Sequence, residues 1–520
     1  MNTLTSDQGY SGEDFFCVDL LSTAEGYRSG HSTIDMLSDD ELLCIFDSYR
    51  RQLDSDIWPW ADLVHVCRRW RRIIFGCPSY LKLYLICKSK TDVQAMPDIW
   101  PVLPLIFHAN LDDKDGDEDD IIGALEHRDR MAGIHVRAFE CSQFTLEKCV
   151  ASMQEPFPVL TSLGFKGDDS EEMTFVTTDA FLGGSAPLLQ RIHLGGIRFP
   201  GLPKLLSSTS DLVYLTLEDF PITGEGHIPP DAMAACLSLL TKLRYLTITF
   251  PLWYPEDQLP PPPTHAVRVL PALTNLLLEG PHEYLEDLVG RIDAPVLTSG
   301  KLEFYHVPAF DTPRVPQFIH RTKMFELPCK EVQVQFRKRQ EYIFHRVDVH
   351  VTFLSSISPG KFYLSFPCSF IPALVETGLR ALVATERIFA QWPSLVSHVE
   401  FLELGDNCCS EERWGVRVAP HWLGFLPQFS AVQTLHFSVV GEVPLFAHML
   451  GGLEGERATK LLPALRTIEL ACPELRARAE TLCVLVPFLV AREEAELPVI
   501  VNVVPYRSAN WRLSSVASSK

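Results

Sequence analysis

A recurring Leu-x-x-Leu-x-Leu unit runs through most of this chain and constrains its fold more than any other feature. In several units a proline stands two residues ahead of the first leucine, as Pro158 precedes Leu160. Such a unit supplies one short strand, and the strand cannot bury its apolar face without a neighbouring unit. The units must therefore stack strand beside strand. They begin at Leu160, Leu189, Leu212, Leu243, Leu273 and Leu297, and the pattern returns at Val399, Val432 and Leu465.

The spacing of the units indicates the kind of stack. The first six starts, at 160, 189, 212, 243, 273 and 297, differ by 29, 23, 31, 30 and 24 residues. These intervals are close to the period of leucine-rich repeats, in which each unit is a short parallel strand and a returning helix or loop. We therefore predict an α/β fold in which residues 157–506 form an irregular leucine-rich-repeat-like solenoid with a parallel sheet. The leucines are assigned to the core, because a parallel strand behind helices needs apolar residues there.

The repeat is incomplete in the middle and closed at the end. Gly300 stands where the sixth unit should carry its middle leucine, and the spacing is lost between residues 303 and 398. Within that gap Val332–Phe336 and Phe362–Phe366 alternate as strands do, and we interpret them as degenerate units of the same sheet. A helix around Leu482–Glu494 and a strand over 498–504 are expected to cap the array.

A second feature lies ahead of the repeats, over residues 36–75. Ser38 followed three residues later by Glu41 is a capping-box signature before an apolar run, so a helix is expected to begin there. A second helix is expected over Trp60–Phe75, and the two form an amphipathic hairpin in a helical domain over 32–80. The apolar face of the second helix consists of Leu63, Val66, Cys67 and Trp70.

The residue string in this hairpin resembles a known motif. Leu-Ser-Asp-Asp-Glu-Leu-Leu-x-Ile-Phe, followed by Leu-Val-x-Val-Cys-Arg-Arg-Trp-Arg, is similar to the F-box, which docks the substrate receptor of a ubiquitin ligase onto the Skp-type adaptor. The next segment, Leu-x-Leu-x-Leu-x-Cys and then Asp-Ile-Trp-Pro-x-Leu-Pro-Leu, resembles the F-box-like proteins abundant in mushroom-forming fungi. The resemblance thus extends to about residue 110. It departs at Ser38, where the family usually has proline, and in the long linker over 50–59.

The resemblance implies a partner and a contact surface. The chain would bind a Skp-type adaptor and through it a cullin–RING ligase, while the repeat region binds an unknown target protein. In this interpretation the chain performs no chemistry itself and contributes proximity and orientation. A ligase-independent interaction scaffold with the same hairpin is the alternative. The residues that would contact the adaptor are Leu37, Leu42, Ile45, Phe46, Val66 and Trp70.

Charge and composition exclude several classes of function. The formal net charge of −20 over 520 residues opposes binding to nucleic acid or to an anionic membrane surface. The first cation is Arg28, so no secretory signal is expected, and the longest apolar run, Leu482–Ala491, is about half the length of a bilayer span. Fourteen cysteines without a regular framework favour reduced thiols in the cytoplasm or nucleus.

No catalytic or metal-binding motif accompanies the repeats. The sequence has no phosphate-binding glycine loop, no Gly-x-Ser-x-Gly and no His-Glu-x-x-His, so we predict neither an enzyme nor a cofactor. The acidic segment over 112–120, in the connecting region 81–156, is interpreted as a solvated loop because it does not match a calcium loop. The proline tract Pro260–Pro263 is interpreted as a loop stiffener, with an SH3 or WW ligand as the alternative.

Target binding is therefore expected on the residues between the leucines and in the loops beyond each strand. Tyr245, Thr247 and Asn275 should point away from the core, because successive strand residues face opposite sides of a sheet. The loops considered are Gly195–Arg198, Glu218–Pro221 and the excursion over 251–263. The terminal segments 1–31 and 507–520 are expected to be a disordered leader and tail.

Overall fold

The computed structural model describes residues 34–52, 61–77, 84–88, 103–110, 118–137, 143–167, 175–251, 267–305, 312–325, 329–341, 344–354, 360–368, 383, 385–406, 424–439, 445–453, 455–471 and 475–505. It divides into two compact units, Met1–Tyr84 and Leu85–Lys520. Several predictions fall outside the described residues: the leader, the linker over 53–60, the acidic residues 112–117, the proline tract and the tail.

The described residues of the first unit form three α-helices, whereas two were expected from the sequence. A 3-10 turn, Ile34–Met36, leads into α1 (Asp39–Gln52). The expected second helix is split into α2 (Ala61–Val66) and α3 (Arg68–Gly76). The prediction of a simple hairpin was wrong at Cys67, whose backbone is extended and whose Sγ accepts a hydrogen bond from the Trp70 amide at 3.4 Å. Cys67 thus acts as the N-cap of α3, and α2 ends before it.

The capping box predicted at the start of α1 is confirmed. The Ser38 amide donates to Glu41 Oε2 at 2.7 Å, and the Glu41 amide donates to Ser38 Oγ at 3.2 Å. Arg69 of α3 reaches the same end of α1, where its Nη2 donates to Asp39 Oδ1 at 2.7 Å. Two amides at the start of α1 are satisfied in this way, and an ion pair joins the first and third helices.

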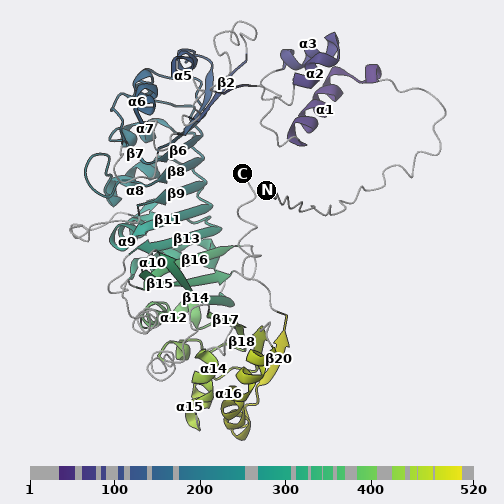
Figure 1. Cartoon of the computed structure of the whole chain (residues 1–520), viewed down its shortest axis with the longest axis vertical. Coiled ribbons are helices and arrows are strands. Elements are labelled where there is room, and N and C mark those ends of the chain that lie inside the picture. The colour runs from purple at the N-terminus through teal and green to yellow at the C-terminus, as the bar shows by residue number, and fades with distance from the viewer. Residues whose placement is uncertain are drawn as a thin grey trace, which may run out of the picture. The chain divides into compact units, whose positions relative to one another are not determined.

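The second unit is an α/β structure built on one large, mostly parallel sheet of 16 described strands (Figure 1). Its first nine strands in sheet order are β1 (Leu85–Lys88), β2 (Leu105–Asn110), β3 (Met131–Arg137), β4 (Ser162–Lys166), β6 (Arg191–Gly195), β8 (Tyr214–Glu218), β9 (Tyr245–Thr249), β11 (Asn275–Pro281) and β13 (Ser299–Tyr305). The remaining seven are β16 (Lys361–Cys368), β15 (Phe344–Leu354), β14 (Glu331–Glu341), β17 (Phe401–Asp406), β18 (Thr434–Val439), β19 (Thr467–Ala471) and β20 (Ile500–Val504).

Helices alternate with the strands and cover the apolar side of the sheet. In Figure 1 the helices from α5 to α10 lie along one side of the strand ladder. They are α5 (Glu118–Leu125), α6 (Gln143–Ser152), α7 (Leu202–Ser208), α8 (Pro230–Ser238), α9 (His282–Arg291) and α10 (Arg314–Arg321). The last acidic residues of the predicted loop, Glu118–Asp120, form the first turn of α5, which corrects the loop assignment there.

The leucine rows form the core, as predicted. Adjacent strands pair in register, so that Leu215 of β8 lies beside Leu246 of β9, which lies beside Leu276 of β11. These three side chains are 0, 1 and 3% exposed. The units that return later in the sequence continue the same rows, because Leu402 lies beside Leu435 and Leu435 beside Ile468. Leu215 and Leu246 are therefore each enclosed by apolar counterparts on both neighbouring strands, whereas Leu276 has Leu246 on one side and Gly300 on the other.

The glycine that interrupts the leucine row has a structural reason. Gly300 of β13 pairs with Phe362 of β16, and a Cβ placed on Gly300 would lie 2.5 Å from the Phe362 ring. The Phe362 side chain is fully buried. Its ring occupies the space that a leucine at position 300 would need, so the core remains filled across the break in the repeat.

The middle of the chain joins the sheet in an order that the sequence analysis did not foresee. The predicted strands at Val332–Phe336 and Phe362–Phe366 are confirmed within β14 and β16. Between them lies β15, which pairs antiparallel with both, while β16 pairs parallel with β13 and β14 parallel with β17. The expectation of an entirely parallel sheet is therefore wrong at β15. This strand alternates as well, at Val349, Val351 and Phe353, which are all buried.

The predicted closing helix and strand are confirmed, and the helix is longer than expected. α16 (Leu475–Glu494) continues past Pro487, and β20 pairs parallel with β19. Arg492, near the end of α16, is fully buried. The guanidinium of Arg492 donates hydrogen bonds to the carbonyl oxygens of Ala458, Leu461, Leu462, Leu465 and Leu497.

None of the described helices combines the length and apolar character needed to cross a lipid bilayer.

The leucine rows generate a first prediction. Replacing Leu246 or Leu276 with alanine should lower the free energy of unfolding by about 2 to 5 kcal/mol, because each change leaves a cavity in a packed core. Thr247→Ala, on the adjacent position of the same strand, should cost far less. Urea denaturation followed by circular dichroism would measure all three. Unchanged midpoints for both leucine variants would contradict the assignment of these rows to the core.

The compensation between Gly300 and Phe362 generates a second prediction. Gly300→Leu restores the repeat pattern, yet it should destabilise the protein by about 1 to 3 kcal/mol, because the new side chain collides with a buried ring. Adding Phe362→Ala to Gly300→Leu should recover part of that loss. Thermal melts of the two variants and of Phe362→Ala alone would show the coupling. If the losses of the single variants simply added in the double variant, the two positions would not share one space.

Candidate binding surface

The face of the sheet opposite the leucine rows carries the polar side chains of the repeats. In β8 and β9 the second and fourth residues are buried, whereas the first and third are partly or fully exposed. The residues named in the sequence analysis follow this rule, since Tyr245 is 38% exposed and Thr247 and Asn275 are partly exposed. We call this the open face. Its side chains form rows that run across the strands, because the strands pair in register.

The first row contains a stack of large flat side chains. Arg191 of β6, Tyr214 of β8 and Tyr245 of β9 are successive neighbours across the sheet. The two tyrosine rings lie 4.4 Å apart with an angle of 7° between their planes, and the Arg191 guanidinium carbon lies 4.9 Å from the centre of the Tyr214 ring. Tyr214 is 36% exposed. These three residues are called the Arg–Tyr–Tyr platform below.

An ion-pair cluster lies on the same face, toward the other end of the strands. Lys166 Nζ of β4 lies 2.9 Å from Glu218 Oε2 of β8, and His193 Nε2 of β6 lies 3.2 Å from Glu218 Oε1. The neighbouring imidazole and then the lysine ammonium hold the pKa of Glu218 down, at about 2. Glu218 is therefore ionised at neutral pH, and its charge is already matched by residues of this chain.

Histidines occupy the neighbouring strands of the open face. The rings of His108 in β2 and His135 in β3 stack at 4.8 Å, and His135 Nε2 lies 3.3 Å from Ser162 Oγ in β4. Burial lowers the pKa of His135 to about 4, and the nearby His108 and His193 act in the same direction. His135 is therefore neutral at pH 7 and can act as a hydrogen-bonding group there. No group of three or more His, Cys, Asp or Glu residues in the described part of the chain could hold a metal ion.

The open face remains polar and internally paired along the later strands. Lys301 of β13 pairs with Glu279 of β11 and lies 3.0 Å from Glu303 on its own strand. Further along the sheet, His436 Nδ1 of β18 lies 3.2 Å from Glu469 Oε2 of β19. In these strands the charged side chains named here are therefore matched by partners of this chain.

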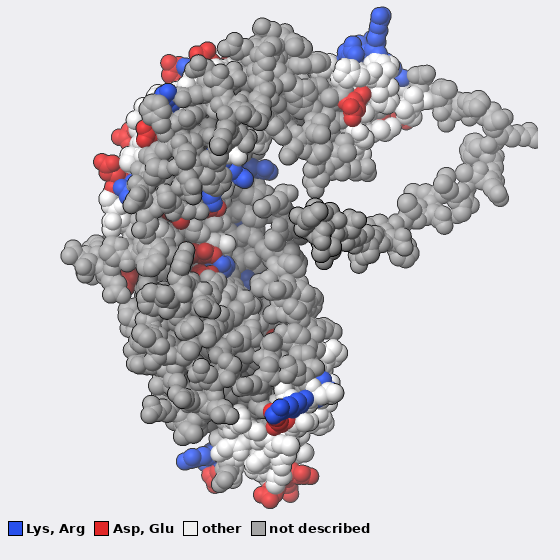
Figure 2. Space-filling view, in the orientation of Figure 1, with Lys and Arg blue, Asp and Glu red and all other residues white. Residues whose placement is uncertain are grey.

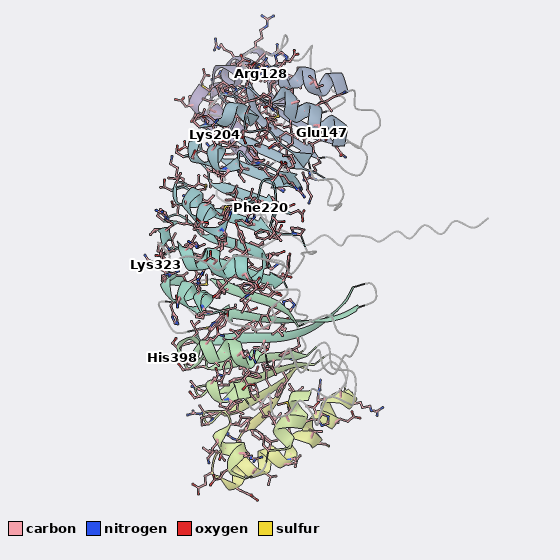
Figure 3. The ribbon with its side chains drawn as sticks, turned by 90° about the vertical axis from the view of Figure 1, so that its left-hand side faces the viewer. Arg128, Glu147, Lys204, Phe220, Lys323 and His398 are labelled. Atoms are coloured by element: carbon pink, nitrogen blue, oxygen red, sulfur yellow. The ribbon has the colours of Figure 1, made fainter. Side chains whose placement is uncertain are left out.

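The loops beyond the strands contribute less exposed surface than the sequence analysis expected. Phe220, from the loop Glu218–Pro221, is 5% exposed and packs edge-on against Phe250 at 5.7 Å. Ile197, from the loop Gly195–Arg198, is 8% exposed. Figure 3 views the second unit from its helix-covered side, with Phe220 labelled. Both apolar side chains belong to the core and are not accessible to a ligand.

The helical unit offers a second candidate surface. Of the six residues predicted to contact an adaptor, Leu42 and Phe46 are 0 and 1% exposed and hold the unit together, and Phe46 packs on the Trp70 ring at 4.8 Å. Leu37 and Trp70 are partly exposed. Ile45 and Val66 are 45 and 58% exposed. The adaptor contact stays a prediction, and the exposed pair are the members of the set that a partner could reach.

Three exposed residues, Met36, Arg191 and Tyr214, were not among those expected to bind a partner. Met36, just ahead of the capping box, is 77% exposed. Tyr214 and Arg191 were not singled out, although a signal was present: Tyr214 and Tyr245 occupy the same position in consecutive repeats, as Tyr-Leu-Thr-Leu and Tyr-Leu-Thr-Ile. Identical positions in consecutive repeats become cross-strand neighbours.

Figure 2 shows Lys and Arg side chains gathered at one end of the helical unit, where Arg68, Arg71 and Arg72 are exposed.

Comparisons with known proteins give no assignment for either surface. No protein-family model and no curated protein matches the sequence. The functional argument therefore depends on the residues of the two surfaces themselves.

The histidines on the open face generate a third prediction. The pKa of His135 is about 4 in the folded protein and 6.5 in the reference state, so folding disfavours its protonation. Its contribution to stability is complete above pH 6.5 and is lost as the pH falls from 6.5 to about 4. His135→Gln should therefore show a shallower fall in stability over this range. Urea denaturation at several pH values would measure the slopes, with Thr216→Ala as a non-titrating control on the same face. Equal slopes in parent and His135→Gln would contradict the prediction.

Proposed function

We propose that this chain is the substrate-recognition subunit of a Skp–cullin–F-box type ubiquitin ligase and acts inside the cell, in the cytoplasm or nucleus. The helical unit binds the Skp-type adaptor, and the sheet unit binds a target protein. The chain itself supplies proximity and orientation, and the transfer chemistry belongs to the partners. The observation that carries the proposal is the exposed apolar surface of the small helical unit.

The composition of that surface supports a protein partner. Met36, Ile45 and Val66 are 77, 45 and 58% exposed, although the unit that carries them buries Leu42 and Ile74 completely. A unit of this size buries only a small core, so large apolar side chains that stay exposed on it are candidates for contact with a partner. Ile45 and Val66 both belong to the F-box-like string.

The arrangement of the second unit supports a target-binding role. We propose that it is an irregular leucine-rich-repeat-like solenoid, because consecutive parallel strands carry their leucines in register and the described helices from α5 to α10 lie along one side of them. Such units keep a fixed core and vary the other face, which provides an extended surface for a protein ligand. The partly exposed rows of the open face have the polar and aromatic composition of such a surface.

The adaptor contact is the basis of a fourth prediction. The double variant Ile45→Asp/Val66→Asp should lower the affinity for a purified Skp-type adaptor at least tenfold, because the contact would bury unpaired carboxylates. Both side chains are exposed in the free chain, so folding should be unaffected. Isothermal titration calorimetry with the full chain would measure the affinity.

A matched control separates a specific contact from a general effect of added charge. Leu188 and Leu239 are 46 and 54% exposed on the second unit, so Leu188→Asp/Leu239→Asp adds the same charge elsewhere. This control should bind the adaptor like the parent. Equal affinities for the parent and Ile45→Asp/Val66→Asp would refute the proposed contact. Adaptor binding without co-purification of a cullin would instead favour the scaffold alternative.

A further inference from the structure

The Arg–Tyr–Tyr platform stands out from the open face because its neighbours in the same row are short. On one side the row continues with Ser162 of β4, and on the other with Asn275 of β11. Strands lie about 4.8 Å apart, so the three large side chains cover a width of about 10 Å across the sheet. The platform is therefore a raised, flat and partly aromatic surface between two lower margins.

The platform also differs from the surrounding face in charge. Arg191 is exposed, and so is Arg244, which immediately precedes Tyr245. Among the described residues neither guanidinium has an acidic partner, whereas the nearby carboxylates are already paired. Asp211 lies 2.7 Å from Lys242, and Glu218 is held by the cluster with Lys166. Arg191 thus brings a guanidinium to the exposed Tyr214 ring, and Arg244 adds a second exposed positive charge one residue before Tyr245 in the sequence.

This local charge is unusual in a chain whose net charge is −20. The acidic molecule as a whole repels an acidic partner, so an acidic segment can approach only where positive charge is left over. Tyrosine and arginine are the residue types most enriched among the residues that dominate protein binding energy. A guanidinium stacked on an aromatic ring is also held in place, so less conformational freedom is lost when a carboxylate binds it.

We propose that the Arg–Tyr–Tyr platform with Arg244 is the principal contact for the target, and that it binds an acidic segment of a protein. Carboxylates of the segment pair with Arg191 and Arg244, and an apolar or aromatic side chain next to them covers the rings of Tyr214 and Tyr245. This inference rests on the target-binding role proposed above and adds to it the chemical class of the partner.

Defined peptides test the proposal on the full chain. Three fluorescein-labelled 12-residue peptides would carry the same two tryptophans and six Glu, six Gln or six Lys residues. Fluorescence anisotropy should show the Glu peptide binding at least tenfold more tightly than the other two, with an affinity that falls as salt is added. Equal affinities for the three peptides, or tighter binding of the Lys peptide, would overturn the proposal.

Two double variants assign any binding to the platform. Arg191→Gln/Arg244→Gln should reduce binding of the Glu peptide to the level of the Gln peptide and remove its salt dependence. Tyr214→Ala/Tyr245→Ala should weaken binding at least fivefold. Tyr214→Phe/Tyr245→Phe keeps the stacked rings and should bind like the parent, which separates loss of the ring surface from loss of folding. Parent-like affinity in both Arg191→Gln/Arg244→Gln and Tyr214→Ala/Tyr245→Ala would refute the assignment.

The controls keep this inference apart from the adaptor contact. Arg476→Gln/Arg478→Gln removes two positive charges from α16 and should leave peptide binding unchanged. Ile45→Asp/Val66→Asp should bind the Glu peptide like the parent, and the platform variants should bind the adaptor like the parent. Failure of the adaptor contact alone would leave peptide binding intact, and failure of the platform alone would leave adaptor binding intact.

Discussion

The second unit depends on the register between parallel strands, which places leucine beside leucine. A one-residue slip would turn every buried side chain to the open face. The buried rows therefore specify the register of the strands. Because Leu215 and Leu246 are each enclosed by neighbours on adjacent strands, no single repeat holds its core alone. The core of the unit is therefore shared between neighbouring strands rather than held within one of them.

Most strands of this unit and their buried residues could be predicted from the sequence, because the leucine spacing indicates which residues face the core. The order of the middle strands could not. Alternation at Val349, Val351 and Phe353 indicates a strand but carries no information on its direction or its neighbours. The replacement of a leucine by Gly300 was visible, yet its compensation by Phe362 depends on a pairing across about sixty residues of sequence. Both features arise from contacts between distant segments.

The candidate surfaces were predictable to different degrees. Amphipathic spacing placed Leu42 and Phe46 on an apolar face, but a partner-binding residue and a core residue look alike in such a pattern. Val66 is exposed at the end of α2, next to the break at Cys67, and that break involves a side-chain cap that spacing alone does not reveal. On the open face, the strand period placed Tyr245 correctly, whereas the stack with Tyr214 and Arg191 needed the register between repeats.

Gly195 lies on the open face between the two members of an ion pair. Lys166, Gly195 and Glu218 are successive neighbours across three strands, and the lysine reaches the glutamate over the glycine between them. Direct neighbours are about 4.8 Å apart, so a pair two strands apart must cross the intervening position. A Cβ on Gly195 would lie 3.4 Å from Lys166 Cγ and 3.5 Å from Glu218 Cβ, so a side chain at this position would be in contact with both members of the pair. The open face can therefore change freely at exposed positions such as Tyr214, but less freely where a glycine makes space for a pair.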